Sequence, residues 1–384
     1  MPPWTSNLIA PITPAGRGAI ATIAVIGPDV LAIVARRFAP ASGKPLTGFS
    51  SGRIVLGRFR SSATEEELVV GLVAADHLEV HCHGGSAAVE AVVAALAEEG
   101  CQPITWQEFG QQLEADPLAA EARIALAAAR TQRTAAILLA QYQGALRSAV
   151  QSIQAEVQQG NLPQAARRLD ELLQYGSVGL HLTQPWKVVL AGRPNVGKSS
   201  LINALVGYRR SIVFDQPGTT RDIVTATTAI DGWPIELSDT AGLRESRDAI
   251  ELAGVERARQ KLTAADLVLL IYEATSPWSA DDELLLAELP PGKPRLVIYN
   301  KCDLGLTAAD CHPPGLAVSA TAGIGLNVLL AEIAMTLVPA APPPGDAVPF
   351  TARQIAALTT ARHALESGNV AEVSRQLASL SEVL

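Results

Sequence analysis

Apolar and polar positions alternate over short distances in the N-terminal part of the chain. A β-branched, apolar run over residues 20–26 ends at a glycine–proline turn, which is typical of a strand. Residues 69–73 and 78–81 are further strand candidates, and an amphipathic helix is expected over 87–99, where a glycine follows it. The pattern predicts a small domain of mixed strands and helices over residues 1–104.

Apolar residues then recur every three or four positions, which is the period of an α-helix. This spacing runs from 118 to 146 and again from 165 to 173, and it predicts a helical domain over 105–183. It returns in 350–384, after an extended proline-rich linker at 339–349. The tail is too short to form a core alone, so we expect it to pack on the earlier helices as one bundle.

Residues 184–338 alternate short apolar runs with helical stretches. This alternation is typical of an α/β domain with a mainly parallel sheet and helices on both faces. The segment lies between the two helical parts. We therefore predict a multidomain chain, α/β and all-α, in which the α/β domain is inserted into a helical bundle.

Composition adds limits on the class of protein. The chain has 384 residues, which is enough for two or three domains, and its 48% hydrophobic content allows real cores. A net charge of −8 argues against a broadly basic nucleic-acid coat, because such a protein needs excess lysine and arginine. No apolar run reaches the roughly 18 residues of a membrane span, and the four cysteines have no paired spacing. We expect a cytoplasmic protein with reduced thiols.

The clearest chemical signal is a phosphate-binding loop at residues 192–199, which fits G-x-x-x-x-G-K-S. It follows a strand at 187–191 and opens a helix at 200–205, as the motif requires. The glycines allow backbone N–H groups to wrap phosphate oxygens at the positive end of a helix. Lys198 is expected to bridge the β and γ phosphates, and the Ser199 hydroxyl to bind Mg²⁺.

Two further motifs suit the γ phosphate and the metal. Asp239 follows a strand and opens the sequence Asp-Thr-Ala-Gly, in which the carboxylate can hold Mg²⁺ through water and the Gly242 N–H can meet the γ phosphate. Thr220 lies in a Gly-Thr-Thr-Arg-Asp segment, where a threonine can complete the Mg²⁺ shell. Leu243 follows Gly242 and cannot orient water, so hydrolysis needs another acid or amide.

Two motifs suit the base. Asp303 ends the sequence Asn-Lys-Cys-Asp, and its carboxylate can accept the N1 and N2 protons of guanine, which adenine cannot supply in that pattern. Ser319 and Ala320 end a later strand and can cover the base through their backbone. Each motif is weak alone, but five in this order, each at a strand end, predict GTP as the nucleotide.

Several phrases resemble the tRNA-modification GTPases called MnmE or TrmE. In the α/β domain they are AGRPNVGKSSLINAL, IVFDQPGTTRD, DTAGLRES and NKCDL, which the Era and Der ribosome-assembly GTPases share in part. Outside it, residues 13–18 and the sequence HLEVHCHGG at 77–85 are similar to that family. The resemblance implies a folate-binding-like α+β N-terminal domain, a helical bundle and an inserted Ras-like P-loop GTPase domain.

The resemblance also implies residue roles. It makes Glu251 the catalytic group that positions the attacking water, and it places K⁺ against Asn195, Thr219 and the backbone of Phe214 and Gln216. Mg²⁺ would be held by Ser199 and Thr220. The residues implied to contact GTP are Asn195, Val196, Gly197, Lys198, Ser199, Ser200, Phe214, Asp215, Gln216, Pro217, Gly218, Thr219, Thr220, Asp239, Thr240, Ala241, Gly242, Asn300, Lys301, Asp303, Ser319 and Ala320.

The chain departs from the family at the implied folate site. Ala24 stands where the family has an arginine, Glu114 stands where it has a lysine, and Glu79 alone of the expected polar contacts is kept. A site for an anionic folate derivative has thus lost cations and gained a carboxylate, so we expect weakened binding. The family's Cys-x-Gly-Lys motif does not occur before Leu384, which leaves open a truncated or a degenerate tail.

Three functions are compatible with these residues. The first is modification of wobble uridines in tRNA as a homodimer, with the flavoprotein partner that the family uses, MnmG or GidA. The second is a regulatory GTP switch that has lost the one-carbon chemistry. The third is ribosome assembly of the Era or Der kind, against which the chain has one GTPase domain and no basic RNA-binding domain after its linker.

His77, His81, Cys82 and His83 raise the alternative of a zinc site. On a strand, His81 and His83 share one face and Cys82 lies on the other. No fourth ligand has a suitable spacing, although Cys101 is nearby. We therefore favour histidines at a turn of a folate-binding-like domain over a metal site.

Overall fold

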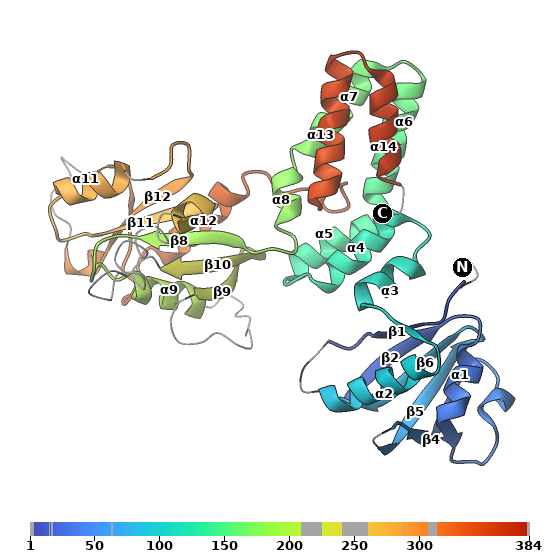
Figure 1. Cartoon of the computed structure of the whole chain (residues 1–384). Helices are drawn as coiled ribbons and strands as arrows, with labels where there is room; N and C mark the ends of the chain where they lie inside the picture. Colours follow the sequence, from blue (N-terminus) through green and yellow to red (C-terminus); the bar gives the residue numbers. More distant parts are fainter. Residues whose placement is uncertain are drawn as a thin grey trace. The chain divides into compact units, whose positions relative to one another are not determined.

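The computed structural model describes most of the chain. The described residues are 4–14, 16, 18–62, 64–208, 225–239, 260–287, 289–305 and 313–381. They form two compact units, Met1–Ile124 and Ala125–Leu384 (Figure 1). No described helix is both long and apolar enough to cross a membrane.

The first unit is built on a seven-stranded sheet in the order β3-β4-β5-β6-β2-β1-β7. Its strands are β1 (Leu8–Pro11), β2 (Ile20–Ile26), β3 (Phe38–Pro40), β4 (Arg53–Arg60), β5 (Glu65–Ala74), β6 (His77–His83) and β7 (Gln102–Pro103). Neighbouring strands are antiparallel, except that β1 and β7 are parallel. The strands expected at 20–26, 69–73 and 78–81 are confirmed within β2, β5 and β6.

The two faces of this sheet carry separate apolar clusters. Helices α1 (Val30–Arg37) and α2 (Ser86–Glu98) supply Val30 and Val92 to the larger cluster, which contains Ile23, Val80 and Cys82 from the strands. Helix α3 (Trp106–Leu113) begins at a capping box, and its Phe109 packs on the other face. A short helix, η1 (Leu46–Gly48), lies between β3 and β4, and α4 (Pro117–Ala127) follows α3.

The second unit contains a helical bundle made from two distant parts of the sequence. The earlier helices are α5 (Gln132–Tyr142), α6 (Ala145–Gln158), α7 (Leu162–Leu173) and α8 (Gly176–Leu180), and the later ones are α13 (Ala352–Glu366) and α14 (Val370–Ser379). Helix α13 packs against α7, and α14 packs against α6 (Figure 1). An ion pair of 2.8 Å between Arg362 and Asp170 joins α13 to α7. The C-terminal tail thus shares one bundle with helices that precede the α/β domain.

The proline-rich segment before α13 is irregular but closely held. The Gln141 side chain donates to the Asp346 carbonyl at 2.9 Å and accepts from the Val348 N–H at 3.1 Å. A methyl group at Gly179 in α8 would overlap the Pro349 carbonyl oxygen, so the segment passes directly over this glycine. The expected extended linker is therefore fixed to the bundle over residues 346–349.

The α/β part of the second unit is a six-stranded sheet in the order β13-β12-β11-β8-β10-β9. Its strands are β8 (Trp186–Ala191), β9 (Thr225–Ile230), β10 (Trp233–Asp239), β11 (Leu267–Glu273), β12 (Arg295–Asn300) and β13 (Leu316–Ala317). Its helices include α9 (Lys198–Gly207), α11 (Ala280–Ala287), η3 (Cys302–Leu304) and α12 (Leu326–Leu337). Only β9 among these strands pairs antiparallel, so the expected mainly parallel sheet is confirmed.

The sequence of the central strands explains this arrangement. Residues 267–272 of β11 are all apolar or aromatic and almost fully buried, as expected of a parallel strand covered on both faces. In an open sheet of this kind, ligands bind beyond the carboxyl ends of the strands. The end of β8, at Ala191, leads into the phosphate loop.

Candidate nucleotide-binding site

The phosphate loop joins β8 to α9 and is held close to the sheet. Gly197 has a φ of 94° and caps the ten-residue helix α9, and Asn195 also has a positive φ, of 64°. A methyl group at Gly192 would overlap the Ile271 carbonyl oxygen, and one at Gly197 would overlap the Asn300 side-chain nitrogen. Both motif glycines therefore permit close approaches, and they leave the N-terminus of α9 at the centre of the loop, where an anion is favoured.

Lys198 lies inside the curve of this loop. Its side chain is buried, and Nζ donates to the carbonyl oxygens of Gly192 at 3.0 Å and Arg193 at 2.9 Å. The ammonium group therefore lies where phosphate oxygens bind in loops of this motif. A bound phosphate would offer it charged acceptors in place of neutral carbonyls.

Ser199, in the first turn of α9, meets Asp239 at the end of β10. Asp239 is the last residue of β10 and is buried, and it lies level with Leu190 of β8 in the parallel ladder. Ser199 Oγ donates to Asp239 Oδ2 at 3.3 Å. A hydroxyl beside a carboxylate is a donor set that suits Mg²⁺, which prefers oxygen ligands.

Asn300 joins three of the motifs found in the sequence. It is 2% exposed at the end of β12, and its Nδ2 donates to the Val196 carbonyl at 2.8 Å. Its Oδ1 accepts from the Ala320 N–H at 3.1 Å. One buried amide therefore links the phosphate loop to the turn that contains Ser319, whose own hydroxyl accepts from the Ala322 N–H.

The remaining residues of the guanine motif project from the same edge. Lys301 has a left-handed backbone, with a φ of 64°, and its Nζ lies 3.1 Å from Glu273 Oε1 at the end of β11. Asp303 is exposed in η3. Its carboxylate is therefore open to a ligand, while Asn300 beside it is committed to the protein.

One pair of residues at the loop had no signal in the sequence. Arg193 Nη2 donates to Asp282 Oδ2 at 2.7 Å, and the Asp282 side chain is 1% exposed. Asp282 stands beside Asp281 in a helix that matches none of the nucleotide motifs. The Ser-x-x-Asp spacing of Ser279 and Asp282 marks Asp282 as a candidate helix cap, but its contact with the loop is known only from the fold.

Part of the expected site lies outside the described residues. This holds for Glu251, which is expected to position the water, and for Phe214, Asp215, Gln216, Pro217, Gly218, Thr219, Thr220, Thr240, Ala241 and Gly242. The structure brings together residues from the loop, from the end of β10, from the guanine motif and from the Ser-Ala turn. The contacts expected of residues 214–220, 240–242 and 251 stay predictions.

The expected folate position lies on β6 of the first unit. Glu79 is opposite Ala24 of β2 and Gly71 of β5, and its Oε2 is 3.5 Å from His81 Nε2. Ala24 is fully buried in the cluster around Phe109. The second departure, Glu114, forms an ion pair of 3.0 Å with Arg123.

The neighbouring histidines have partners other than a metal. The His81 ring nitrogen Nδ1 is 3.0 Å from Thr22 Oγ1, and His83 pairs with Glu66. Cys82 is buried on the opposite face, as expected from strand alternation, and burial raises the pKa of its thiol to about 11. Among the described residues, no three His, Cys, Asp or Glu side chains are grouped closely enough to hold a metal ion.

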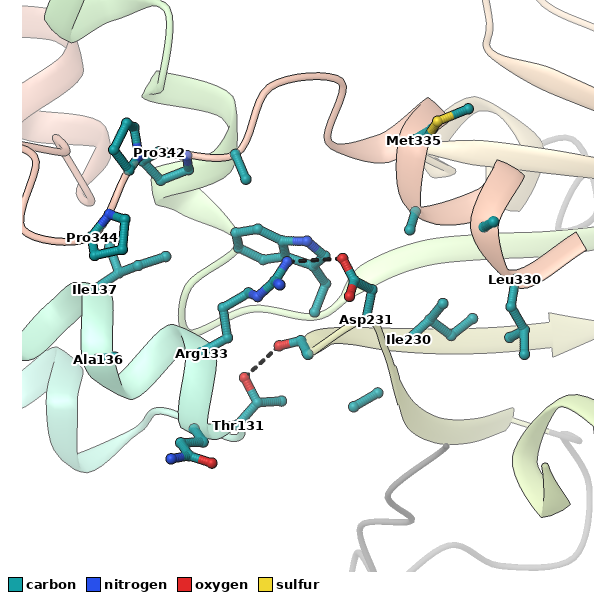
Figure 2. Close-up of a pocket in the computed structure, with 18 of the residues that line it drawn as sticks. Thr131, Arg133, Ala136, Ile137, Ile230, Asp231, Leu330, Met335, Pro342 and Pro344 are labelled. Atoms are coloured by element: carbon teal, nitrogen blue, oxygen red, sulfur yellow. Dashed lines mark hydrogen bonds and ion pairs between the residues drawn. The ribbon is translucent and has the colours of Figure 1, made fainter. Parts of the chain in front are cut away.

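A cavity of about 960 Å³ lies away from the nucleotide site. Helix α5, the β9–β10 turn, α12 and the proline-rich segment line it (Figure 2). At one wall Arg133 pairs with Asp231 at 2.9 Å and lies over the Trp233 ring, and Thr131 Oγ1 donates to the Gly232 carbonyl at 2.6 Å. The β9–β10 turn lies at the end of β10 opposite Asp239. The cavity is lined by both the bundle and the α/β domain, and it lies where the two are in contact.

Comparisons with known proteins agree with both parts of the chain. Residues 7–112 match the family described as the GTP-binding protein TrmE N-terminus, and residues 187–301 match the family of 50S ribosome-binding GTPases. The tRNA modification GTPase MnmE of a Synechococcus species is 34% identical over 85% of this chain and 79% of its own length.

Relatives from other bacterial groups give similar figures. The tRNA modification GTPase MnmE of Chloroflexus aurantiacus is 34% identical over 86% of this chain and 81% of its own. That of Heliobacterium modesticaldum is 31% identical over 84% of this chain and 79% of its own. The similarity therefore extends well beyond the GTPase domain.

Proposed function

We propose, because the chain belongs to the MnmE family of tRNA modification GTPases, that its hydrolysis of GTP serves the modification of wobble uridines in tRNA. The single observation that carries the nucleotide part is the Asn300 amide, which ties the phosphate loop to the guanine motif. A nucleotide that spans both motifs has its phosphates at α9 and its base at Asp303.

In this proposal the residues of the chain bind and orient GTP. Backbone N–H groups of residues 195–200 and the Lys198 ammonium hold the phosphates. The Asp303 carboxylate accepts from the guanine N1 and N2 groups, and Ser319 and Ala320 cover the base. Glu251 aligns a water molecule for in-line attack on the γ phosphate, and this assignment rests on the family resemblance.

Two cations fit the residues that the loop supplies. The adjacent Ser199 hydroxyl and Asp239 carboxylate suit Mg²⁺, with Thr220 as a further ligand, and Mg²⁺ would neutralise charge on the β and γ phosphates. The resemblance assigns K⁺ to Asn195, Thr219 and the backbone of Phe214 and Gln216. The positive φ of Asn195 supports a specialised position at this turn.

The resemblance also supports three proposals about partners and location. The chain would act as a homodimer, it would work with a flavoprotein of the MnmG or GidA kind, and it would act on tRNA in the cytoplasm. The relatives are tRNA modification GTPases by name, which supports the substrate class.

A folate derivative is the weakest of the proposed cofactors. The N-terminal unit would be folate-binding-like, with Glu79 as a polar contact. The buried Ala24 opposite Glu79 offers no cation to an anionic ligand. This observation favours a second candidate function, a GTP switch that keeps the GTPase cycle without one-carbon chemistry.

GTP turnover tests the catalytic part of the proposal. The purified chain is assayed in KCl and in NaCl at equal ionic strength, beside Asn195→Ala and Glu251→Ala. Asn327→Ala is the matched control, because Asn327 is an exposed asparagine in α12. We expect K⁺ to accelerate hydrolysis, both site variants to lose it, and the control to keep it. Turnover that ignores the cation and survives Glu251→Ala would contradict the assigned roles.

The tRNA part needs a separate measurement. The chain is expressed in a bacterium that lacks its own family member, and wobble uridines are analysed by mass spectrometry of digested tRNA. Restored modification supports the proposal. Active GTP hydrolysis with unmodified tRNA identifies the switch function instead, and salt-sensitive association with ribosomal subunits would favour ribosome assembly.

A further inference from the structure

The ion pair of Arg193 and Asp282 ties the phosphate loop to α11. Arg193 is the second residue of the loop motif, and Asp282 lies 89 residues later in the first turn of the helix. The contact is 2.7 Å long. The loop motif at residues 192–199 does not itself specify an acidic partner for Arg193. The pair forms because the fold brings α11 against the loop.

Asp282 is also held by contacts at the start of its own helix. The Ser279 N–H and hydroxyl donate to Asp282 Oδ2 at 3.0 and 2.8 Å, which caps α11. The carboxylate is almost completely buried, and a buried charge is costly unless it is paired and hydrogen-bonded. At this capping position the Asp282 carboxylate faces the loop, and the Arg193 guanidinium pairs with its negative charge.

The surroundings leave few other partners for this carboxylate. Tyr272 of β11 faces the pair, and burial, followed by the Asp282 charge, raises the pKa of its hydroxyl. Both the Tyr272 hydroxyl and Asp282 Oδ1 are buried, and neither has a hydrogen-bond partner among the residues that the structure describes. Asp282 thus depends on Arg193 and Ser279.

Arg193 passes this restraint to the working part of the loop. Its carbonyl oxygen accepts from Lys198 Nζ at 2.9 Å, and Asn195, with its left-handed backbone, is two residues further on. The strands hold the two ends of the loop, through Gly192 against β11 and the Val196 carbonyl against Asn300. Arg193 is the anchor of the outer turn between those ends.

We propose that Asp282 is a positioning residue for GTP binding, which acts through Arg193 to keep the outer turn of the phosphate loop in the shape that receives phosphates. The proposal concerns nucleotide binding by this chain and is independent of its action on tRNA. A preorganised loop loses less freedom when the nucleotide binds. Loss of the anchor should therefore appear as faster nucleotide release.

The test uses Asp282→Asn in the full chain. An asparagine oxygen can still accept from the Ser279 N–H, so the helix cap is kept while the charge on Arg193 loses its partner. GDP release is followed by stopped flow with a fluorescent GDP analogue. We expect the release rate to rise about five- to tenfold, because Asp282 does not contact the nucleotide and only part of the effect of losing one charge-assisted hydrogen bond reaches it. The KM for GTP should rise while kcat at saturating GTP changes less than about twofold.

The matched control is Asp231→Asn, which breaks an Arg–Asp pair of 2.9 Å at the opposite end of β10. Its release rate should stay within about twofold of the parent. Melting temperatures show whether each variant is folded. A purely structural role for Asp282 would lower the melting temperature of Asp282→Asn without changing GDP release, and that result would overturn the proposal.

Arg193→Gln and the double variant complete a cycle. Two residues that act as one anchor should be non-additive, so the double variant should release GDP no faster than the faster single variant. Additive effects would overturn the proposal. If Asp282→Asn does not fold, the double variant carries the test, since it removes both charges. Release at the parent rate from this variant would again refute the anchor.

Discussion

Replacement of Asn300 by alanine should loosen the whole nucleotide edge of the α/β domain. The amide makes hydrogen bonds of 2.8 Å to the Val196 carbonyl and 3.1 Å to the Ala320 N–H. Alanine leaves both backbone groups without this partner in a buried place. Each bond lost in this way costs about 1–2 kcal/mol, so the free energy of unfolding of the variant should be lower by about 2–4 kcal/mol.

Urea unfolding of the full chain, followed by tryptophan fluorescence, measures this loss. Three of the five tryptophans, Trp186, Trp233 and Trp278, lie in the α/β domain and report its transition. Asn161→Ala is the control, because Asn161 is an exposed residue at the start of α7 and should cost less than about 1 kcal/mol. Equal midpoints for the two variants would refute the assignment of Asn300 as a buried link.

Two further changes test other parts of the second unit. Gly179→Ala places a methyl group against the Pro349 carbonyl and should destabilise the chain by about 1–3 kcal/mol in thermal melting, whereas Gly207→Ala, which meets open space, should not; equal melting points would contradict the close passage of the linker. Burial lowers the pKa of His181, whose ring stacks on Trp186, so the unfolded chain takes up its proton first as the pH falls. The stability from neutral His181 is therefore present above its unfolded pKa of about 6.5 and is lost below it. Between pH 7 and 5 the parent should lose more stability than His181→Gln, and parallel pH profiles would refute this.

The sequence predicted the parts of the site that depend on local order. A glycine-rich motif between an apolar strand and a helix has few other structures open to it, and the loop before α9 is found as expected. The apolar run of β11 likewise required burial on both faces. Asn300 was assigned to the base motif, but its contact with Val196 crosses 104 residues and needed the folded sheet.

Other elements were missed because their signal is shared or interrupted. Strand β4 was not predicted, although Val55 and Phe59 alternate with exposed residues, because arginines and Gly57 weaken the run. The structure explains that glycine, since a methyl group there would overlap the Ala39 carbonyl. The Ser-x-x-Asp spacing of Ser279 and Asp282 could have distinguished Asp282 from the exposed Asp281 as a helix cap, but its contact with Arg193 depends on the fold.

The helices of the shared bundle are synthesised at different times. Helix α7 ends at Leu173 and its partner α13 begins at Ala352, so 178 residues lie between the two. At roughly 5–20 residues per second, about 10–40 s pass between the synthesis of α7 and the completion of α14, and α6 and α7 lack both partner helices until then. The inserted α/β domain can fold during that interval. The apolar faces of α6 and α7 are exposed during the same interval. Conditions that slow translation should therefore increase aggregation of the nascent chain, with less effect on the completed protein.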